Sequence, residues 1–137
     1  MTRTLSISRD GYETMLERAH EGAPREVCGV LGGRRTAASV LVESAVPVPN
    51  VADEPRARYE LDPERQLAAI ESLEERGEEV VGFYHSHPDG PAGPSATDRA
   101  QATWPDAHYV IVSLPEESVG AWLWTGERFL ERPVEID

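Results

Sequence analysis

The beginning of the chain predicts one strand followed by an amphipathic helix. Residues 3–7 form a short run of β-rich composition. Residues 9–20 then carry apolar side chains at helical spacing, namely Tyr12, Met15, Leu16 and Ala19. A stripe at this spacing lies on one side of a helix and can pack against a sheet. Gly22 and Pro24 end the predicted helix.

Two further β-rich runs come next and are followed by a long connection. Residues 26–33 ("EVCGVLGG") and residues 38–46 ("ASVLVESAV") are separated by a short polar turn, and this order predicts a hairpin. A loop rich in proline covers residues 47–57. The tetrapeptide "RYEL" at residues 58–61 then predicts a short strand.

The second helix has a clear start signal in the sequence. Asp62 is followed by Pro63, which is the arrangement of an N-cap and a proline at the first helical position. The apolar stripe expected for this helix consists of Leu67, Ile70 and Leu73, and Gly77 closes it. Residues 79–87 ("EVVGFYHSH") begin apolar on both faces, which is typical of a central strand.

The remaining chain predicts one short helix and three strands. After a loop at residues 88–94, Ser95 opens a helix that extends to about Trp104. Three strand-like runs joined by tight turns follow, at residues 108–114, 119–125 and 127–136. Helices alternate with strands early and strands follow strands late, so we expect a mixed sheet flanked by helices, in the α/β or α+β class. At 137 residues, the chain is expected to form a single domain over residues 1–137.

Composition narrows the classes of function. With 13 basic and 25 acidic residues, the formal net charge of −12 argues against nucleic acid as a partner. No apolar stretch is long enough to span a membrane, and the first ten residues lack the apolar segment of a secretory signal, so we expect a cytoplasmic protein. The only cysteine, Cys28, excludes an internal disulfide and a zinc site built from several cysteines.

Candidate chemistry gathers at residues 85–98. Side chains two positions apart on a strand share a face, so His85 and His87 point the same way and Ser86 points away. Ser95 and Asp98 are three positions apart at a helix start and share its first turn. Two histidines and one carboxylate match the ligand count of a catalytic zinc site, which leaves the fourth position for water.

Each of these features also has a purely structural interpretation. A histidine pair on a strand is more often packing or surface than a metal site, and Ser95 with Asp98 also fits a capping box. His108 precedes an apolar strand, and we expect it to pack or to lie behind the metal ligands rather than to bind a metal itself. Cys28 would share a strand face with Glu26 and could close a structural zinc site, although a buried free thiol is the interpretation that we favour.

The combined pattern resembles a known family. "HSHPDGPAGPSATD" follows His-x-His-Pro, six residues, Ser-x-x-Asp, and this resembles the signature of the JAMM (MPN+) metalloproteases. The family also has a glutamate before a Cys-Gly strand, and "REVCGVLGG" supplies Glu26. The resemblance extends from about Leu5 to about Leu123, and the loop "PVPNVADEPRARYELDP" resembles that of small bacterial and archaeal members. It implies a JAMM/MPN fold with a cytidine-deaminase-like three-layer arrangement.

The resemblance also implies a reaction. His85, His87 and Asp98 would bind one Zn²⁺, Glu26 would act as general base and then acid, and Ser95 would hydrogen-bond the oxygen of the tetrahedral intermediate. The expected partner is a ubiquitin-like or sulfur carrier protein, cleaved at the peptide or isopeptide bond after its C-terminal Gly-Gly. Release of cysteine from a carrier–cysteine adduct is one form of this reaction.

A channel that admits only glycine would select such a tail, because Gly-Gly has no side chains. We expect the loop at residues 47–61, with Arg56 and Arg58, to form one wall of this channel. A homodimer is left open by the sequence.

Two other functions compete with this hypothesis. A non-catalytic MPN scaffold or protein-binding module would have the same fold, but scaffold members typically lose the histidines or the glutamate, which this chain keeps. Nucleobase deamination uses His-x-Glu followed by Pro-Cys-x-x-Cys, and one cysteine cannot supply those ligands. The sequence therefore favours the metalloprotease.

Overall fold

A computed structural model of the protein describes residues 3–137; residues 1 and 2 of the predicted domain lie outside the described part. Within this range the chain forms eight strands and three helices. In chain order they are β1 (Thr4–Ile7), α1 (Arg9–Gly22), β2 (Cys28–Arg35), β3 (Ser39–Val48), α2 (Pro63–Glu75), β4 (Glu79–His87), α3 (Ala96–Gln101), β5 (His108–Ser113), β6 (Ser118–Trp124), β7 (Phe129–Arg132) and β8 (Val134–Ile136).

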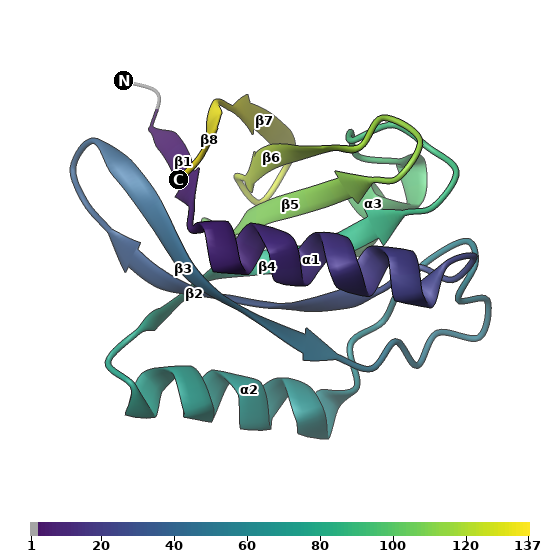
Figure 1. Cartoon of the computed structure of the whole chain (residues 1–137), viewed down its shortest axis with the longest axis horizontal. Coiled ribbons are helices and arrows are strands. Elements are labelled where there is room, and N and C mark those ends of the chain that lie inside the picture. Colours follow the sequence, from purple (N-terminus) through teal and green to yellow (C-terminus); the bar gives the residue numbers. More distant parts are fainter. Residues whose placement is uncertain (1–2) are drawn as a thin grey trace.

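All the strands belong to one mixed sheet, with the order β7-β6-β5-β4-β2-β3-β1-β8 (Figure 1). The predicted hairpin is formed by β2 and β3, which pair antiparallel. The predicted central strand β4 lies between β2, its antiparallel neighbour, and β5, its parallel neighbour. The two histidines at the end of β4 are therefore supported by strands on both sides.

The sheet curls so that its two edges approach each other. Strands β7 and β8 are separated in the chain only by Pro133, yet β7 pairs with β6 at one edge and β8 pairs with β1 at the other. The carbonyl of Pro133 accepts a hydrogen bond of 2.8 Å from the amide of Leu5. The prediction of one strand over residues 127–136 was wrong because this proline lacks a donor for the ladder and separates the two pairings.

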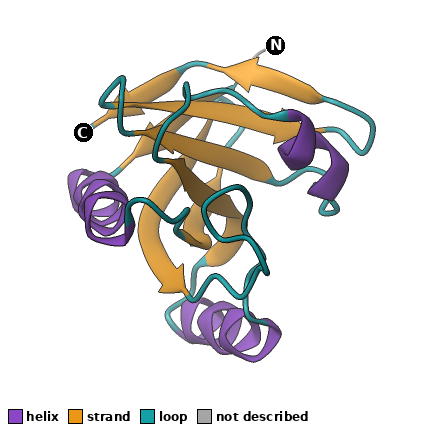
Figure 2. Ribbon diagram, turned by 90° about the vertical axis from the view of Figure 1, so that its right-hand side faces the viewer, coloured by secondary structure: helices purple, strands orange, loops and turns teal. Residues whose placement is uncertain are grey.

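Helices cover both faces of the sheet and make three layers (Figure 2). On one face, Met15 and Ala19 of α1 pack into a core with strand residues such as Leu31. On the other face, Ala69 and Leu73 of α2 pack into a second core, which includes Val30, Phe83 and Tyr109. The mixed sheet flanked by helices is thus confirmed.

Three local predictions were wrong. Residues 58–61 are not a strand, because they belong to the long loop between β3 and α2, in which one isolated bridge joins Asn50 to Leu61 within the loop itself. Helix α3 ends at Gln101 instead of Trp104, where the chain turns toward β5. Leu67 is 58% exposed and lies outside the packed side of α2.

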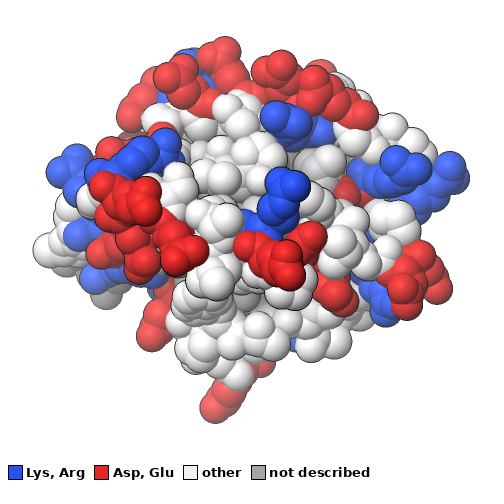
Figure 3. Space-filling model, turned by 90° about the horizontal axis from the view of Figure 1, so that it is seen from below, with Lys and Arg blue, Asp and Glu red and all other residues white. Residues whose placement is uncertain are grey.

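The described residues include no helix that is long and apolar enough to cross a membrane. On the face that carries α2, acidic and basic side chains are interspersed with uncharged ones (Figure 3). The net charge of −12 is therefore not collected into one acidic patch on this face.

Leu73 and Leu67 provide a matched test of the packing of α2. Leu73 is fully buried, so Leu73→Ala should lower the free energy of unfolding by about 2–5 kcal/mol through lost burial and a residual cavity. Leu67→Ala removes the same atoms from an exposed position and should change the free energy of unfolding by less than about 0.5 kcal/mol. Urea-induced unfolding followed by circular dichroism measures both, and equal losses would contradict the packing described.

Candidate metal centre

Four buried side chains from three parts of the chain converge beside the end of β4. They are Glu26, which lies just before β2, His85 and His87 at the end of β4, and Asp98 in the first turn of α3. One potential ligand atom from each lies within 4.8 Å of those of the others. Of the sequence-predicted residues, the structure thus brings together the two histidines, the aspartate and the glutamate.

The three predicted metal ligands face one another closely. Asp98 Oδ2 lies 3.1 Å from His85 Nε2 and 3.0 Å from His87 Nε2, and the two nitrogen atoms are 3.2 Å apart. Ligand atoms bound to one tetrahedral zinc at about 2.0–2.1 Å are separated by about 3.3 Å. The nitrogen and oxygen atoms are therefore spaced as donors to a single small ion would be.

Local hydrogen bonds at the start of α3 orient Asp98. Ser95 Oγ accepts a hydrogen bond of 3.0 Å from the Asp98 amide, and Asp98 Oδ2 accepts one of 3.0 Å from the Ser95 amide. This is the capping box that the sequence offered as an alternative to a functional site. The capping box does not exclude a functional site, because the capping carboxylate also faces His85 and His87.

The second ring nitrogen of His87 is also held. His87 Nδ1 donates a hydrogen bond of 2.8 Å to the carbonyl of Pro91, in the loop that follows β4. In the neutral ring, a donor bond at Nδ1 leaves the lone pair of Nε2 to bind a metal, as outer hydrogen bonds do for metal-binding histidines. Without a metal, a proton on Nε2 can bond Asp98 instead; burial lowers the pKa of His87, but this hydrogen bond outweighs it and raises that pKa. The proline-rich loop therefore sets the tautomer as well as the direction of this ring.

Burial and hydrogen bonding set the protonation states of the ligands. Burial lowers the pKa of His85, which favours the neutral imidazole that metals require. Burial opposes ionisation of Asp98, but its hydrogen bonds with His85 and His87 outweigh this and hold the pKa of the carboxyl well below its usual range. The site thus presents a carboxylate and a neutral imidazole near neutral pH.

Glu26 has the environment of a group that exchanges protons. Its side chain is 7% exposed, and its Oε1 atom has no hydrogen-bond partner. Burial raises the pKa of Glu26 to about 7, partly offset by His87. A carboxyl with a pKa near the working pH can both accept and release a proton.

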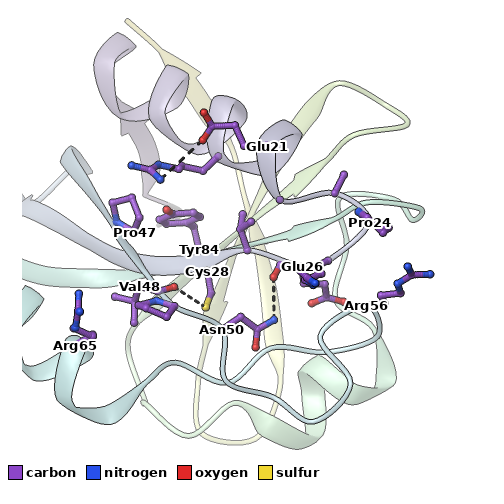
Figure 4. Close-up of a pocket in the computed structure, with 16 residues that line it drawn as sticks. Glu21, Pro24, Glu26, Cys28, Pro47, Val48, Asn50, Arg56, Arg65 and Tyr84 are labelled. Atoms are coloured by element: carbon purple, nitrogen blue, oxygen red, sulfur yellow. Dashed lines mark hydrogen bonds and ion pairs between the residues drawn. The ribbon is translucent and has the colours of Figure 1, made fainter.

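The loop between β3 and α2 holds the backbone of Glu26 from two sides. The Glu26 amide donates a hydrogen bond of 2.7 Å to the carbonyl of Pro55. Asn50 Nδ2 donates to the carbonyl of Glu26 at 2.9 Å (Figure 4). It also donates to the carbonyl of Arg58 at 3.1 Å. The other end of the amide, Asn50 Oδ1, accepts from two amides of the same loop. All four hydrogen-bonding positions of this side chain are used.

A second residue of the loop contacts one of the candidate metal ligands directly. The ring of Tyr59 stacks on the ring of His85, with 4.3 Å between the centroids and 21° between the planes. The sequence analysis missed both Tyr59 and Asn50. The signal for Asn50 was its place in a proline-rich loop, where asparagine side chains bond the nearby backbone, but nothing in the sequence indicated that Glu26 is its partner.

Cys28 does not join the four candidate ligands. Strand β2 begins at Cys28, so Glu26 precedes the strand and the expectation that both share one strand face was wrong. The thiol donates to the carbonyl of Val48 at 3.4 Å, and burial raises the pKa of Cys28 to about 12. A protonated thiol bonded to the backbone matches the buried free cysteine that we favoured over a structural zinc ligand.

Two cavities meet at Glu26. The larger, of about 730 Å³, lies between the end of α1, the end of β3 and the loop, and Arg56 lines it (Figure 4). The smaller, of about 370 Å³, is lined by Glu26, Arg56, His87 and Ser95 among others. Arg58 is half-buried and lines neither cavity. The structure thus places Arg56 and Ser95 beside the cluster and leaves Arg58 outside both cavities.

The comparison with protein families agrees with this geometry. The family described as prokaryotic homologs of the JAB domain matches residues 8–125. The chain belongs to this family. The match confirms the resemblance to JAMM proteins that the five motif residues indicated.

Curated relatives of this JAB-domain protein include three peptidases. It is 47% identical over 137 residues to the desampylase of Haloferax volcanii, covering 97% of this chain and 96% of the relative. It is 40% identical over 109 residues to the CysO-cysteine peptidase of Mycobacterium tuberculosis, covering 80% and 73%. A probable TtuB-protein conjugate cleaving protease of Thermus thermophilus is 43% identical over 89 residues, covering 64% and 57%.

Solved structures show the same fold. A protein from Desulfitobacterium hafniense superposes with a TM-score of 0.87 at 32% identity, covering 97% of this chain and 92% of that one. A JAB1/MPN domain protein from Archaeoglobus fulgidus superposes with a TM-score of 0.62 at 25% identity, covering 95% and 98%. The JAMM/MPN fold expected from the motif is confirmed.

The raised pKa of Glu26 predicts a pH-dependent loss of stability in the metal-free protein. Below pH 4.5 the carboxyl is protonated in both the folded and the unfolded chain. As the pH rises toward 7, the unfolded chain loses this proton first. The free energy of unfolding should therefore fall by about 1–3 kcal/mol relative to that of Glu26→Gln.

Chelator-treated wild type and Glu26→Gln should therefore have similar unfolding free energies at pH 4.5, and the variant should be more stable at pH 8. Urea unfolding across this range measures the difference. The exposed Glu13→Gln is the matched control and should show no such divergence. A Glu26→Gln difference that is the same at every pH would contradict the raised pKa.

Proposed function

We propose that this protein is a zinc-dependent peptidase or isopeptidase that cleaves after the C-terminal Gly-Gly of a ubiquitin-like or sulfur carrier protein. The observation that carries the proposal is a buried, unpartnered Glu26 carboxyl with a pKa near 7 beside a cluster of two histidines and an aspartate. The names of the relatives support the substrate class, since they are a desampylase, a CysO-cysteine peptidase and a probable TtuB-conjugate protease.

His85, His87 and Asp98 would hold the zinc. Their donor set of two imidazole nitrogens and one carboxylate oxygen, already spaced 3.0–3.2 Å apart, fits the ion. When bound, zinc polarises the scissile carbonyl and lowers the pKa of a water from about 16 to about 7. The remaining chemistry falls to the side chains around it.

Glu26 moves the proton in this scheme. Its carboxylate takes a proton from the attacking water and passes it to the nitrogen of the leaving amine, so no covalent acyl-enzyme forms. The pKa of about 7 suits both halves of the task, because the group is deprotonated often enough to act as base and acidic enough to return the proton. The hydrogen bonds from the loop at Asn50 and Pro55 keep the Glu26 backbone in place.

Ser95 supplies a donor for the developing oxyanion. Its Oγ accepts the hydrogen bond from the Asp98 amide, which leaves the hydroxyl hydrogen free to donate. The residue is exposed and lines the 370 Å³ cavity together with Glu26 and His87. A donor preorganised in this way stabilises the charge that forms on the carbonyl oxygen of the substrate.

The carrier tail would enter along the loop between β3 and α2. Arg56 lines both cavities beside Glu26 and can pair with a carboxylate or carbonyl of the tail. Release of cysteine from a carrier–cysteine adduct is one form of this reaction, and the similarity to a CysO-cysteine peptidase supports it. A cytoplasmic location and a homodimer stay predictions.

A non-catalytic scaffold would not need this arrangement. Burying a carboxyl without a partner costs stability, and a protein that only binds partners gains nothing from it. All five motif residues are retained, and four of them converge in the fold. The arrangement favours the enzyme.

Metal content and cleavage test the proposal together. The purified protein should contain about one zinc per chain by elemental analysis and should cleave a carrier protein fused through its C-terminal Gly-Gly. Glu26→Ala should keep the zinc and lose activity by about 100-fold or more, because it removes the proton transfer alone. His85→Ala should lose both zinc and activity. A protein without metal, or a Glu26→Ala variant as active as wild type, would overturn the assignment.

Arg56 and Arg58 give a matched pair for the substrate channel. Both are arginines of one loop, but only Arg56 lines the cavities at Glu26. Arg56→Gln should raise KM for the carrier fusion by about 5- to 30-fold at nearly constant kcat, because it removes a charge-assisted contact of about 1–2 kcal/mol. Arg58→Gln should leave KM within about twofold. Equal effects of the two variants would argue against Arg56 as a specific wall residue.

A further inference from the structure

A basic cavity of about 480 Å³ lies at the end of the sheet opposite the metal centre. Six residues line it: Arg3 before β1, Arg35 at the end of β2, Asp106 just before β5, His108 at the start of β5, Leu123 on β6 and Arg132 on β7. Three of these six are arginines and one is a histidine. The whole chain has 25 acidic and 13 basic residues, so the excess of basic residues in this cavity is opposite to the overall charge.

The arginines of the cavity differ in their partners. Arg35 pairs with Glu79 at 2.8 Å and donates to the carbonyl of Asp106 at 3.3 Å. Arg132 is half-buried; within residues 3–137 no ion pair involves it, and its buried Nε has no hydrogen-bond partner. Buried cations are normally paired or hydrogen-bonded, because leaving water without a partner is costly. The half-buried guanidinium of Arg132 therefore has no counter-charge among the described residues.

His108 adds a second unpartnered polar group to the same cavity. The residue is 3% exposed, and its Nδ1 atom has no hydrogen-bond partner. Burial, together with the nearby charges of Arg35, Arg132 and Arg3, lowers the pKa of His108 to about 4. The sequence analysis expected this histidine to pack or to lie behind the metal ligands. Its unpartnered Nδ1 and the unpartnered Nε of Arg132 belong to two residues that line the same cavity.

We propose that this cavity binds a small oxyanion of the phosphate type, held by the guanidinium groups of Arg132 and Arg3 with His108 beside them. Guanidinium groups present planar forks of donors that match the oxygens of phosphate. The volume is within the range of about 300–1,000 Å³ that is common for small-molecule sites. The acidic residues nearby are Glu79, which pairs with Arg35, and the exposed Asp106. The remaining charge favours an anion.

The proposed anion site is separate from the metal centre. His108 pairs with Gly82 on β4, three residues before His85 on that strand, which places the two sites about 10 Å apart along β4. None of its lining residues belongs to the metal cluster. The proposal therefore does not rest on the proposed peptidase activity, and each can fail without the other.

Calorimetric titration with inorganic phosphate at constant ionic strength tests the site on the zinc-loaded protein. Wild type should bind one phosphate per chain, and Arg132→Gln and Arg3→Gln should each weaken the affinity by about tenfold or more. Arg34→Gln is the matched control, since it removes the same charge from the neighbouring position on β2 but lies outside the cavity and pairs with Glu43. It should change the affinity by less than about twofold.

The imidazole signals of His108 in NMR spectra locate the ligand. Saturating phosphate should shift them and raise the pKa of His108, because a nearby anion favours the imidazolium; sulfate should act similarly, and chloride at equal ionic strength should not. Binding that persists in both cavity variants would place the phosphate on the zinc or elsewhere. The proposal would be overturned by that result, by the absence of saturable binding, or by an equal loss of affinity in Arg34→Gln. Should one cavity variant fail to fold, the other variant and the His108 shifts decide.

Discussion

The carboxylate of Asp98 is the point on which the metal centre depends. Its Oδ2 atom accepts a hydrogen bond from the Ser95 amide and lies within 3.1 Å of the Nε2 atoms of both His85 and His87. The same atom thus closes the first turn of a short helix and faces the two rings on the central strand. Because α3 has only six residues, it gains little stability from its own length, and its capping box fixes where the carboxylate points.

The loop between β3 and α2 completes the centre from the other side. It binds the backbone of Glu26 through Asn50 and Pro55, and it stacks Tyr59 on His85. A loop without regular structure can do this because its own polar groups are satisfied locally by the Asn50 side chain. The proposed general base, Glu26, and the proposed metal ligand His85 are therefore both contacted by this one loop.

The two ends of β4 have opposite electrostatic character. At its carboxyl end, Glu26 and Asp98 surround the histidines, and Asp98 favours protonation of His87. Near its beginning, Gly82 pairs with His108, whose neighbours are arginines that disfavour its protonation. The tertiary structure thus places histidines in two different electrostatic environments, and only the one at the carboxyl end of β4 favours a bound cation.

The sequence by itself determined the elements and the candidate ligands. The apolar residues on both faces at the start of residues 79–87 placed β4, and the Asp62–Pro63 pair placed the start of α2. The spacing of His85, His87, Ser95 and Asp98 indicated a three-ligand metal site with a serine. These features are local, because side-chain periodicity and capping act over a few residues.

Only the tertiary structure decided the features that depend on distant contacts. Four such features depend on segments that are far apart in the chain. They are the split of residues 127–136 between the two edges of the curled sheet, the hydrogen bond of Asn50 to Glu26, the stacking of Tyr59 on His85, and the position of Cys28 outside the candidate ligands. The raised pKa of Glu26 belongs here too, because it arises from burial. Burial is a property of the assembled fold, and no local pattern carries it.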